Sequence, residues 1–234
     1  MKTSNKIVYS FLAFAWLSIM VTLVISFFFS RLRGFSTLDK VEVKEWPVLG
    51  SYSVVSIQDS WVVSIERQKE GTIQYTKYYF SREREELLED PDPFFYEVRN
   101  DTLFVKGMKQ KPTGKFSIHV GPIKSIVLKD VTEVRVKEVG IDSLIVKANH
   151  GHLTMEENHG VGFLRFEGKN ESRLQIMKIP ALELYLDQSK AEIYKEMGDV
   201  SGNLARRSEV ILPTKLGELN LTKDENSKVS IEEY

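Results

Sequence analysis

The stretch "SRLQIMKIPALELYLDQSKAEIYKEM", residues 172–197, decides the fold because it repeats one short pattern. Apolar residues return in pairs with a single residue between them. The members are Leu174 and Ile176, then Leu182, Leu184 and Leu186, then Ala191 and Ile193. Side chains of a β-strand point alternately to opposite faces, so each pair places apolar groups on one face. The residues between them, such as Gln175 and Glu183, are expected to face solvent.

The same apolar positions return about every twenty residues from residue 123 onward. One series is Ile126, Leu144, Leu164, Leu184 and Leu204; a second is Val134, Leu153, Leu174, Ile193, Val210 and Val229. A repeat of this length with two short strands per unit is typical of solenoids. One coil cannot bury its apolar face alone, whereas coils stacked ~4.8 Å apart form a continuous core. The pattern therefore predicts an all-β parallel β-helix.

An antiparallel sandwich is the alternative fold, because it also has strands at intervals of about 8 to 12 residues with turns between them. Such a sandwich commonly uses the two-residue hairpin turns Asn-Gly and Asp-Gly. Neither dipeptide occurs in the sequence. The regular twenty-residue step also favours stacked coils over independent hairpins.

Three regions are predicted along the chain: residues 1–34, 35–122 and 123–234. The first is a tail with an apolar segment, and the last contains the β-helix repeats. Residues 35–122 alternate apolar and polar side chains as strands do, interrupted by a charged insert at 81–93. This middle region is either the first part of the solenoid or a separate β-cap.

The first region contains an apolar run from Ile7 to Phe29 without a single charge. The hydrocarbon core of a bilayer requires about 20 apolar residues in a helix. A cleaved signal peptide has a shorter apolar region and small residues at its cleavage site, but this run ends in "SFFFSRLRG". Residues 7–29 are therefore predicted to be a transmembrane helix that anchors the protein in a membrane by a single pass.

Composition excludes several classes of function. The 234 residues include no cysteine, which rules out disulfides, zinc–thiolate sites and thiol nucleophiles. Hydrophobic residues make up 42% and charged residues 28%, a balance typical of globular proteins. The net charge is −1, so no basic excess indicates a nucleic-acid partner.

The segment "NHGHLTMEENHG" gathers the candidate metal ligands His150, His152, Glu156, Glu157 and His159. Residues two apart in a strand share a face, so a metal pair is geometrically possible. The other interpretation, which we favour, is a solvent-exposed corner rich in Asn, His and Gly. No P-loop, G-x-S-x-G or G-x-G-x-x-G motif occurs. We therefore predict no catalytic, metal-binding or cofactor-binding residues.

Several stretches carry a resemblance to a known family. They are "YSVVSIQDSWVVSIERQ", "EVRNDTLFVKG" and "KFSIHVGPIKSIVLKDVTEVRV", followed by the repeats. Their order resembles the bacterial head GIN domain family, also called "putative auto-transporter adhesins", which are β-helical cell-envelope domains common in Bacteroidetes. The resemblance is one of pattern and carries no catalytic motif. The chain departs from the family in its apolar N-terminal run and in repeats richer in charge. The resemblance implies that the membrane is a bacterial inner membrane and that the C-terminal domain is periplasmic.

Three functions are compatible with these features. The leading prediction is a noncatalytic envelope protein that presents a β-helical surface for adhesion or for interaction with a protein or polysaccharide partner. The second is a cytoplasmic, membrane-tethered scaffold similar to bactofilins. The third is a polysaccharide-active enzyme, since β-helices also host such enzymes; it would require carboxylates gathered on one wall, and the sequence shows no such concentration.

Overall fold

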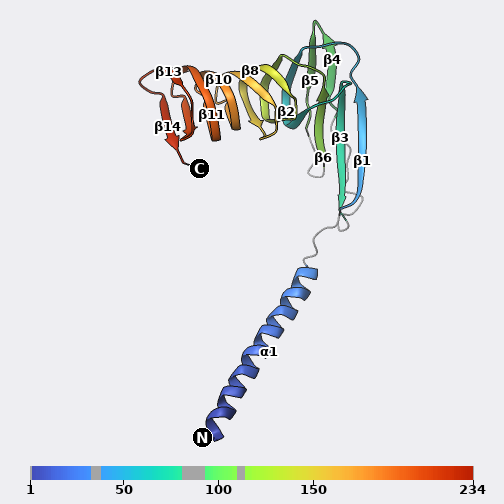
Figure 1. The fold of residues 1–234 in the computed structure, drawn as a ribbon. Helices are drawn as coiled ribbons and strands as arrows, with labels where there is room; N and C mark the ends of the chain where they lie inside the picture. Colours follow the sequence, from blue (N-terminus) through green and yellow to red (C-terminus); the bar gives the residue numbers. More distant parts are fainter. Residues whose placement is uncertain (1, 33–37, 81–92, 110–113, 234) are drawn as a thin grey trace. The chain divides into compact units, whose positions relative to one another are not determined.

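The computed structural model of the chain describes residues 2–32, 38–80, 93–109 and 114–233. Figure 1 shows one helix and the strands that follow it. Their bounds are α1 (Lys2–Leu32), β1 (Leu38–Pro47), β2 (Val54–Arg67), β3 (Thr72–Phe80), β4 (Phe95–Arg99), β5 (Thr102–Lys106), β6 (Gly114–Val120), β7 (Ser125–Lys137), β8 (Ile141–Met155), β9 (Val161–Lys169), β10 (Arg173–Asp187), β11 (Lys190–Ala205), β12 (Glu209–Pro213), β13 (Leu219–Lys223) and β14 (Lys228–Glu232).

The chain divides into two compact units, one of which holds α1. The other unit comprises Val41–Tyr78 and Leu88–Tyr234 and contains the β-sheet. The predicted boundaries at residues 34 and 122 stay predictions. The charged insert at 81–93 lies, apart from Pro93, outside the described residues.

The predicted membrane anchor at residues 7–29 requires correction. Over the part of the chain that the structure describes, no helix combines the length and the apolar character that a membrane crossing needs. Such a crossing takes about 20 consecutive apolar residues. The predicted single-pass location in an inner membrane, with a periplasmic C-terminal domain, is therefore contradicted.

The all-β prediction and the parallel β-helix are confirmed. Strands β7 to β12 pair in parallel with their neighbours and wind into a solenoid of about five turns. Each turn contributes one strand segment to each of two walls. We call wall 1 the segments that end at Gln58, Lys129, Asn149, Lys169, Asp187 and Ala205, and wall 2 the segments that follow them after a corner.

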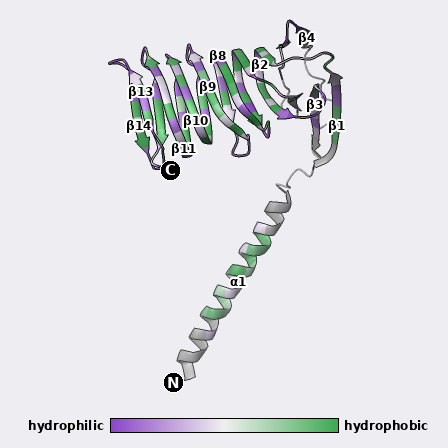
Figure 2. Cartoon of the chain, turned by 45° about the horizontal axis from the view of Figure 1, so that its top comes forward, coloured by the Kyte–Doolittle hydropathy of each residue, from purple (hydrophilic) through white to green (hydrophobic). Residues whose placement is uncertain are grey.

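The core lies between the two walls and is built from the inward residue of each alternation. Figure 2 shows hydrophobic and hydrophilic residues alternating along the strands. One inward row of wall 1 stacks Ile126, Val146, Phe166, Leu184 and Gly202 on successive turns. The central row of wall 2 stacks Val134, Leu153, Leu174, Ala191 and Val210. Every side chain in these rows but glycine is fully buried, so each turn covers the core of the next.

The two predicted apolar series identify buried residues but not all of their neighbours. In wall 2, Leu174 pairs with Ala191 and not with Ile193, which belongs to the next inward row. In wall 1, the chain takes 20 residues from Leu144 to Leu164 but only 18 from Leu164 to Leu182. A slip of two residues keeps a side chain on the same face of a strand. A constant twenty-residue step therefore predicts correctly which residues are buried, but it assigns some of them to the wrong inward row.

The first turn of the solenoid is not stacked in sequence order. Strand β7 pairs along its length with β2, although β3 to β6 lie between them in the sequence. On its other side, β2 pairs in parallel with β5 and β6. Antiparallel strands then cover this end: β4 pairs with β5 through a turn at Asn100 and Asp101, and β3 pairs with β6. The two positive φ angles at Asn100 and Asp101, 49° and 60°, suit a tight hairpin.

The corner from wall 1 to wall 2 is formed by residues with left-handed backbone. These corner residues are Asp59, Asp130, His150, Asn170, Glu171, Gln188, Arg206 and Arg207, and all have φ between 45° and 69°. Asn, Asp and other polar residues tolerate this conformation at turns better than apolar ones do. The polar corners that punctuate the sequence therefore mark the chain reversals between walls.

Buried serines stabilise the same corners from inside. Ser208 Oγ accepts a hydrogen bond from the Ser189 N–H at 3.3 Å and donates one to the Ala205 carbonyl at 2.6 Å. Ser227 Oγ accepts the Ser208 N–H in the same way, at 3.2 Å. Each hydroxyl thus satisfies a buried backbone N–H of the preceding turn, a group that is costly to leave without a partner.

Substitution of Ser208 by alanine is expected to lower the free energy of unfolding by about 1–3 kcal/mol, because the buried Ser189 N–H loses its acceptor. Urea unfolding of the full chain measures the change. The control is Ser201→Ala on the exposed face of wall 1, which should change stability by less than about 0.5 kcal/mol. Equal effects of the two substitutions would show that the corner hydrogen bond contributes nothing.

Candidate functional site

The outer face of wall 2 carries charged and amide side chains that bond to one another across turns. Gln175 Nε2 donates to Glu192 Oε2 at 2.8 Å and to the Tyr194 hydroxyl at 3.0 Å. Lys190 Nζ lies 2.8 Å from Glu192 Oε1 and 3.1 Å from Glu209 Oε2. The network makes Gln175 half-buried, although the sequence suggested that it faces solvent.

This network fixes the charge state of its central carboxylate. Partial burial acts to raise the pKa of Glu192, but hydrogen bonds from Lys190, Gln175 and Tyr194 outweigh it and hold the pKa at about 2. The pKa of Glu133 is also lowered: burial again opposes the shift, and hydrogen bonds from Arg135 and Thr154 produce it. A general acid at neutral pH requires the opposite, a carboxyl pKa raised to about 6–7. These two carboxylates are therefore suited to holding the wall and not to proton transfer.

The three histidines of the predicted cluster are held apart by different partners. His150 Nδ1 lies 3.2 Å from Asp130 Oδ1 at the exposed corner, and His152 Nε2 lies 3.1 Å from Gln175 Oε1 on wall 2. His159 is buried at the opposite corner. Within the described residues, no group of three His, Asp or Glu side chains is arranged to hold a metal ion. The structure thus does not bring the three histidines together.

His159 links two turns through both ring nitrogens. Its Nδ1 accepts the Val161 N–H at 2.8 Å, and its Nε2 donates to the Lys178 carbonyl at 2.9 Å. This pattern requires the neutral imidazole, because a protonated Nδ1 cannot accept. Burial lowers the pKa of His159, although the hydrogen bond to Lys178 acts to raise it. The residue therefore acts as a structural link whose bonds depend on its protonation state.

Acidification is expected to destabilise the protein through His159. A folded-state pKa below the unfolded value of about 6.5 means that the unfolded chain takes up the proton first. The contribution of neutral His159 to the free energy of unfolding is thus complete above pH ~6.5, and it is lost as the pH falls below this value. Urea unfolding between neutral and mildly acidic pH should show a smaller loss of stability for His159→Gln than for the unmodified chain.

His150→Gln serves as the control for that measurement, because His150 is exposed and bonded only at the corner. It should keep the pH dependence of the unmodified chain. If His159→Gln also loses as much stability on acidification as the unmodified chain, protonation of His159 is not the cause of that loss. The pKa of His152 is also lowered, mainly by burial, so His152 contributes to the pH dependence of stability that remains in His159→Gln.

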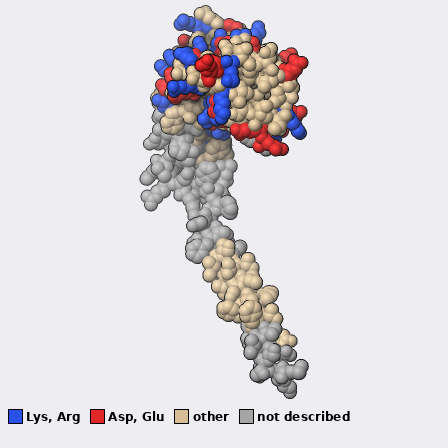
Figure 3. All heavy atoms as spheres, turned by 90° about the vertical axis from the view of Figure 1, so that its left-hand side faces the viewer, with Lys and Arg blue, Asp and Glu red and all other residues tan. Residues whose placement is uncertain are grey.

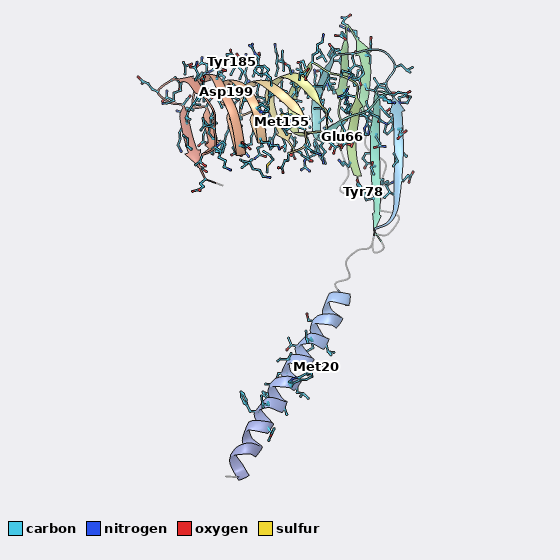
Figure 4. The ribbon with its side chains drawn as sticks, viewed as in Figure 1. Met20, Glu66, Tyr78, Met155, Tyr185 and Asp199 are labelled. Atoms are coloured by element: carbon cyan, nitrogen blue, oxygen red, sulfur yellow. The ribbon has the colours of Figure 1, made fainter. Side chains whose placement is uncertain are left out.

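The outer face of wall 1 carries an Arg–Tyr stack, and an Arg–Asp ion pair lies at its corner. Arg165 stacks over the Tyr185 ring at 4.7 Å, and the Tyr185 hydroxyl donates to Glu183 at 2.7 Å. Tyr185 points outward from the wall (Figure 4) and is 38% exposed. Arg206, at the corner, forms a bidentate ion pair with Asp187. Arg206 and Arg207 are therefore part of a solvent-exposed corner.

A row of basic and amide side chains runs along wall 1 next to the corner. The strand register places Lys106, Gln58, Lys129, Asn149 and Lys169 on neighbouring strands in that order. We call these five residues the lysine row. Their neighbours Ile57, Leu128, Ala148 and Gly168 are buried, so the lysine row faces outward. Among the described residues, no carboxylate forms an ion pair with Lys106, Lys129 or Lys169.

The lysine row was only partly predictable from the sequence. Positions 129, 149 and 169 follow the twenty-residue step and directly precede the corners. The other two members could not be found in this way, because β2 and β5 join the wall out of sequence order.

Two of the hollows over the described residues bear on binding, one beside the lysine row and one of larger volume. One holds about 350 Å³ on wall 1 and is lined by Lys129, Asn149 and Lys169 of the lysine row, with Lys147 and Glu167 beside them. The other holds about 780 Å³ at the corner between wall 2 and wall 1, near His159, Pro180 and Met197.

Figure 3 looks onto the end formed by β13 and β14, where an uncharged area is bordered by Lys, Arg, Asp and Glu side chains.

No protein-family model and no curated protein matches the chain. Solved structures do show similarity. One is a "putative adhesin" from Bacteroides fragilis, at 10% identity and a TM-score of 0.47, with 85% of this chain and 100% of that chain covered. A second, a "putative adhesin" from Parabacteroides distasonis, has 13% identity and a TM-score of 0.46, with 83% and 97% covered.

A third similar structure is a "putative cell adhesion protein" from Clostridium sporogenes, at 12% identity and a TM-score of 0.31, with 83% of this chain and 99% of that chain covered. None of these descriptions names the head GIN domain. That resemblance therefore stays a prediction.

Proposed function

We propose that the protein is a noncatalytic binding protein whose solenoid walls attach it to a protein or polymer on a surface, as an adhesin does. The observation that carries the proposal is the in-register stacking of wall 1 from β2 to β11. Stacked turns in fixed register place outward side chains in straight rows at a spacing of ~4.8 Å. Repeat proteins use extended surfaces of this kind to bind their partners.

The ionisable side chains support a role without catalysis. Glu192 is held as a carboxylate by three hydrogen-bond donors, and Glu133 is held by Arg135 and Thr154. Both carboxyl pKa values are shifted away from the range that acid–base catalysis uses. The wall 2 charges thus neutralise one another and stiffen the surface.

Attachment of protein-coated beads to purified cell envelopes tests the proposal. Beads that carry the folded full chain are expected to be retained on at least one envelope preparation, and beads that carry the heat-unfolded chain are not. Equal retention of both bead types on every preparation would overturn the proposal, because binding would then not depend on the stacked walls.

A further inference from the structure

We infer that the lysine row is a binding site for an acidic polysaccharide, laid along the solenoid axis over wall 1. The inference rests on the proposed binding function and names its partner class. The row crosses five adjacent strands, β5, β2, β7, β8 and β9, so it extends over about 19 Å at ~4.8 Å per strand. A linear polymer along this axis would meet its members one after another.

The spacing of the cations fits a polymer with regularly placed charges. Lys106, Lys129 and Lys169 alternate with Gln58 and Asn149, so that the ammonium groups stand on every second strand. Two strand spacings amount to about 10 Å. Three exposed cations at this period can contact carboxylates at successive points along an acidic polysaccharide.

The charges of the lysine row are available to a ligand, unlike those of wall 2. Lys190 on wall 2 is bound to two carboxylates, Glu192 and Glu209. Asp187, which is paired with Lys169 in the strand register, is bonded to Arg206, and Glu167 lies 2.9 Å from Arg165. Lys169 acts on Asp187 only through a weak electrostatic effect that helps to lower the Asp187 pKa, behind the larger effect of the Arg206 hydrogen bond.

The amides and the hollow provide the polar contacts that a sugar ring needs. Asn149 Oδ1 accepts from Asn170 Nδ2 at 2.8 Å, which leaves the Asn149 amide nitrogen to donate outward. The hollow of about 350 Å³ lies between Lys129 and Lys169, above the small residue Ala148. A sugar ring can therefore approach the wall between two cations.

A polysaccharide fits the lysine row better than a nucleic acid does. Single-stranded nucleic acids are bound by aromatic side chains on which bases stack, interleaved with basic groups. The five members of the row include no aromatic residue, the ring of Tyr185 on the same wall is already covered by Arg165, and the net charge of the protein is −1. Amide donors between cations suit the hydroxyls and carboxylates of an acidic sugar.

Binding of the purified full chain to immobilised polygalacturonate tests the inference, with neutral dextran and single-stranded DNA as comparison ligands. The key variant is Lys106→Gln/Lys129→Gln/Lys169→Gln. It should bind polygalacturonate at least about tenfold more weakly than the unmodified chain. The matched control is Lys178→Gln/Lys215→Gln/Lys223→Gln, which removes three charges from other exposed positions and should change the affinity less than about twofold.

Salt provides the second readout. Binding should weaken strongly toward about 1 M salt, where the Debye length falls to about 3 Å. Equal losses in the two triple variants, equal binding to dextran, or binding that ignores salt would each overturn the inference. Binding to single-stranded DNA with the same dependence on the lysine row would replace the polysaccharide with a nucleic acid. If polygalacturonate is not bound but the beads still attach to envelopes, this inference fails while the proposed function stands.

Discussion

Replacement of Gly202 by alanine is expected to lower the free energy of unfolding by about 3–5 kcal/mol, the sum of backbone strain and steric overlap. Gly202 has φ of 140°, a conformation that is almost confined to glycine. A Cβ atom at this position would lie 1.9 Å from the Leu184 carbonyl oxygen on the neighbouring turn. Because that oxygen belongs to the backbone of a paired strand, it cannot move aside without breaking the stack.

Gly121→Ala is the matched control, because a Cβ atom there would meet nothing within 4 Å. It should change the unfolding free energy by less than about 1 kcal/mol, in either direction. Chemical denaturation of the two full-length variants and the unmodified chain provides the comparison. A Gly202→Ala protein as stable as Gly121→Ala would mean that β10 and β11 do not approach as closely as the structure shows.

Truncation of Phe166 to alanine is expected to cost about 3–5 kcal/mol, since it removes a large ring from the core. Phe166 is fully buried and stacks between Val146 and Leu184 on the adjacent turns of wall 1. The exposed Phe95, at 54% relative exposure, serves as the control, and Phe95→Ala should cost less than about 1 kcal/mol. Similar losses for the two would contradict the placement of Phe166 inside the solenoid.

A double variant tests the surroundings of Phe166 more closely. A Cβ atom on Gly168 would lie 2.7 Å from Phe166 Cε1, so the glycine makes room for the ring. Gly168→Ala should therefore destabilise the unmodified chain more than it destabilises Phe166→Ala, in which the ring is absent. Additive effects in this cycle would show that the two positions do not touch.

The solenoid could be predicted from sequence because burial repeats at a period that the chain keeps over many turns. The exact row of each residue could not be predicted, as Ile193 shows, because a slip of two residues preserves the buried face. The non-sequential stacking of β2 between β5 and β7 also left no local signal, since it depends on which strand edges meet.

The candidate site was also only partly predictable from the sequence. His150, His152 and His159 lie within ten residues of one another, but the alternation of strand and corner sends them to three different environments. Proximity in sequence thus suggested a cluster that the fold separates. The lysine row is the reverse case, because Lys106 and Lys129 are distant in sequence and share one wall.

Noncatalytic binding can be tested by the molar mass of polygalacturonate before and after incubation with the full chain, recorded together with the fraction bound. We expect the polymer to be bound through wall 1 and recovered at unchanged length. Recovery of shortened polymer, in an amount that rises with protein concentration, would contradict this expectation and identify the protein as an enzyme.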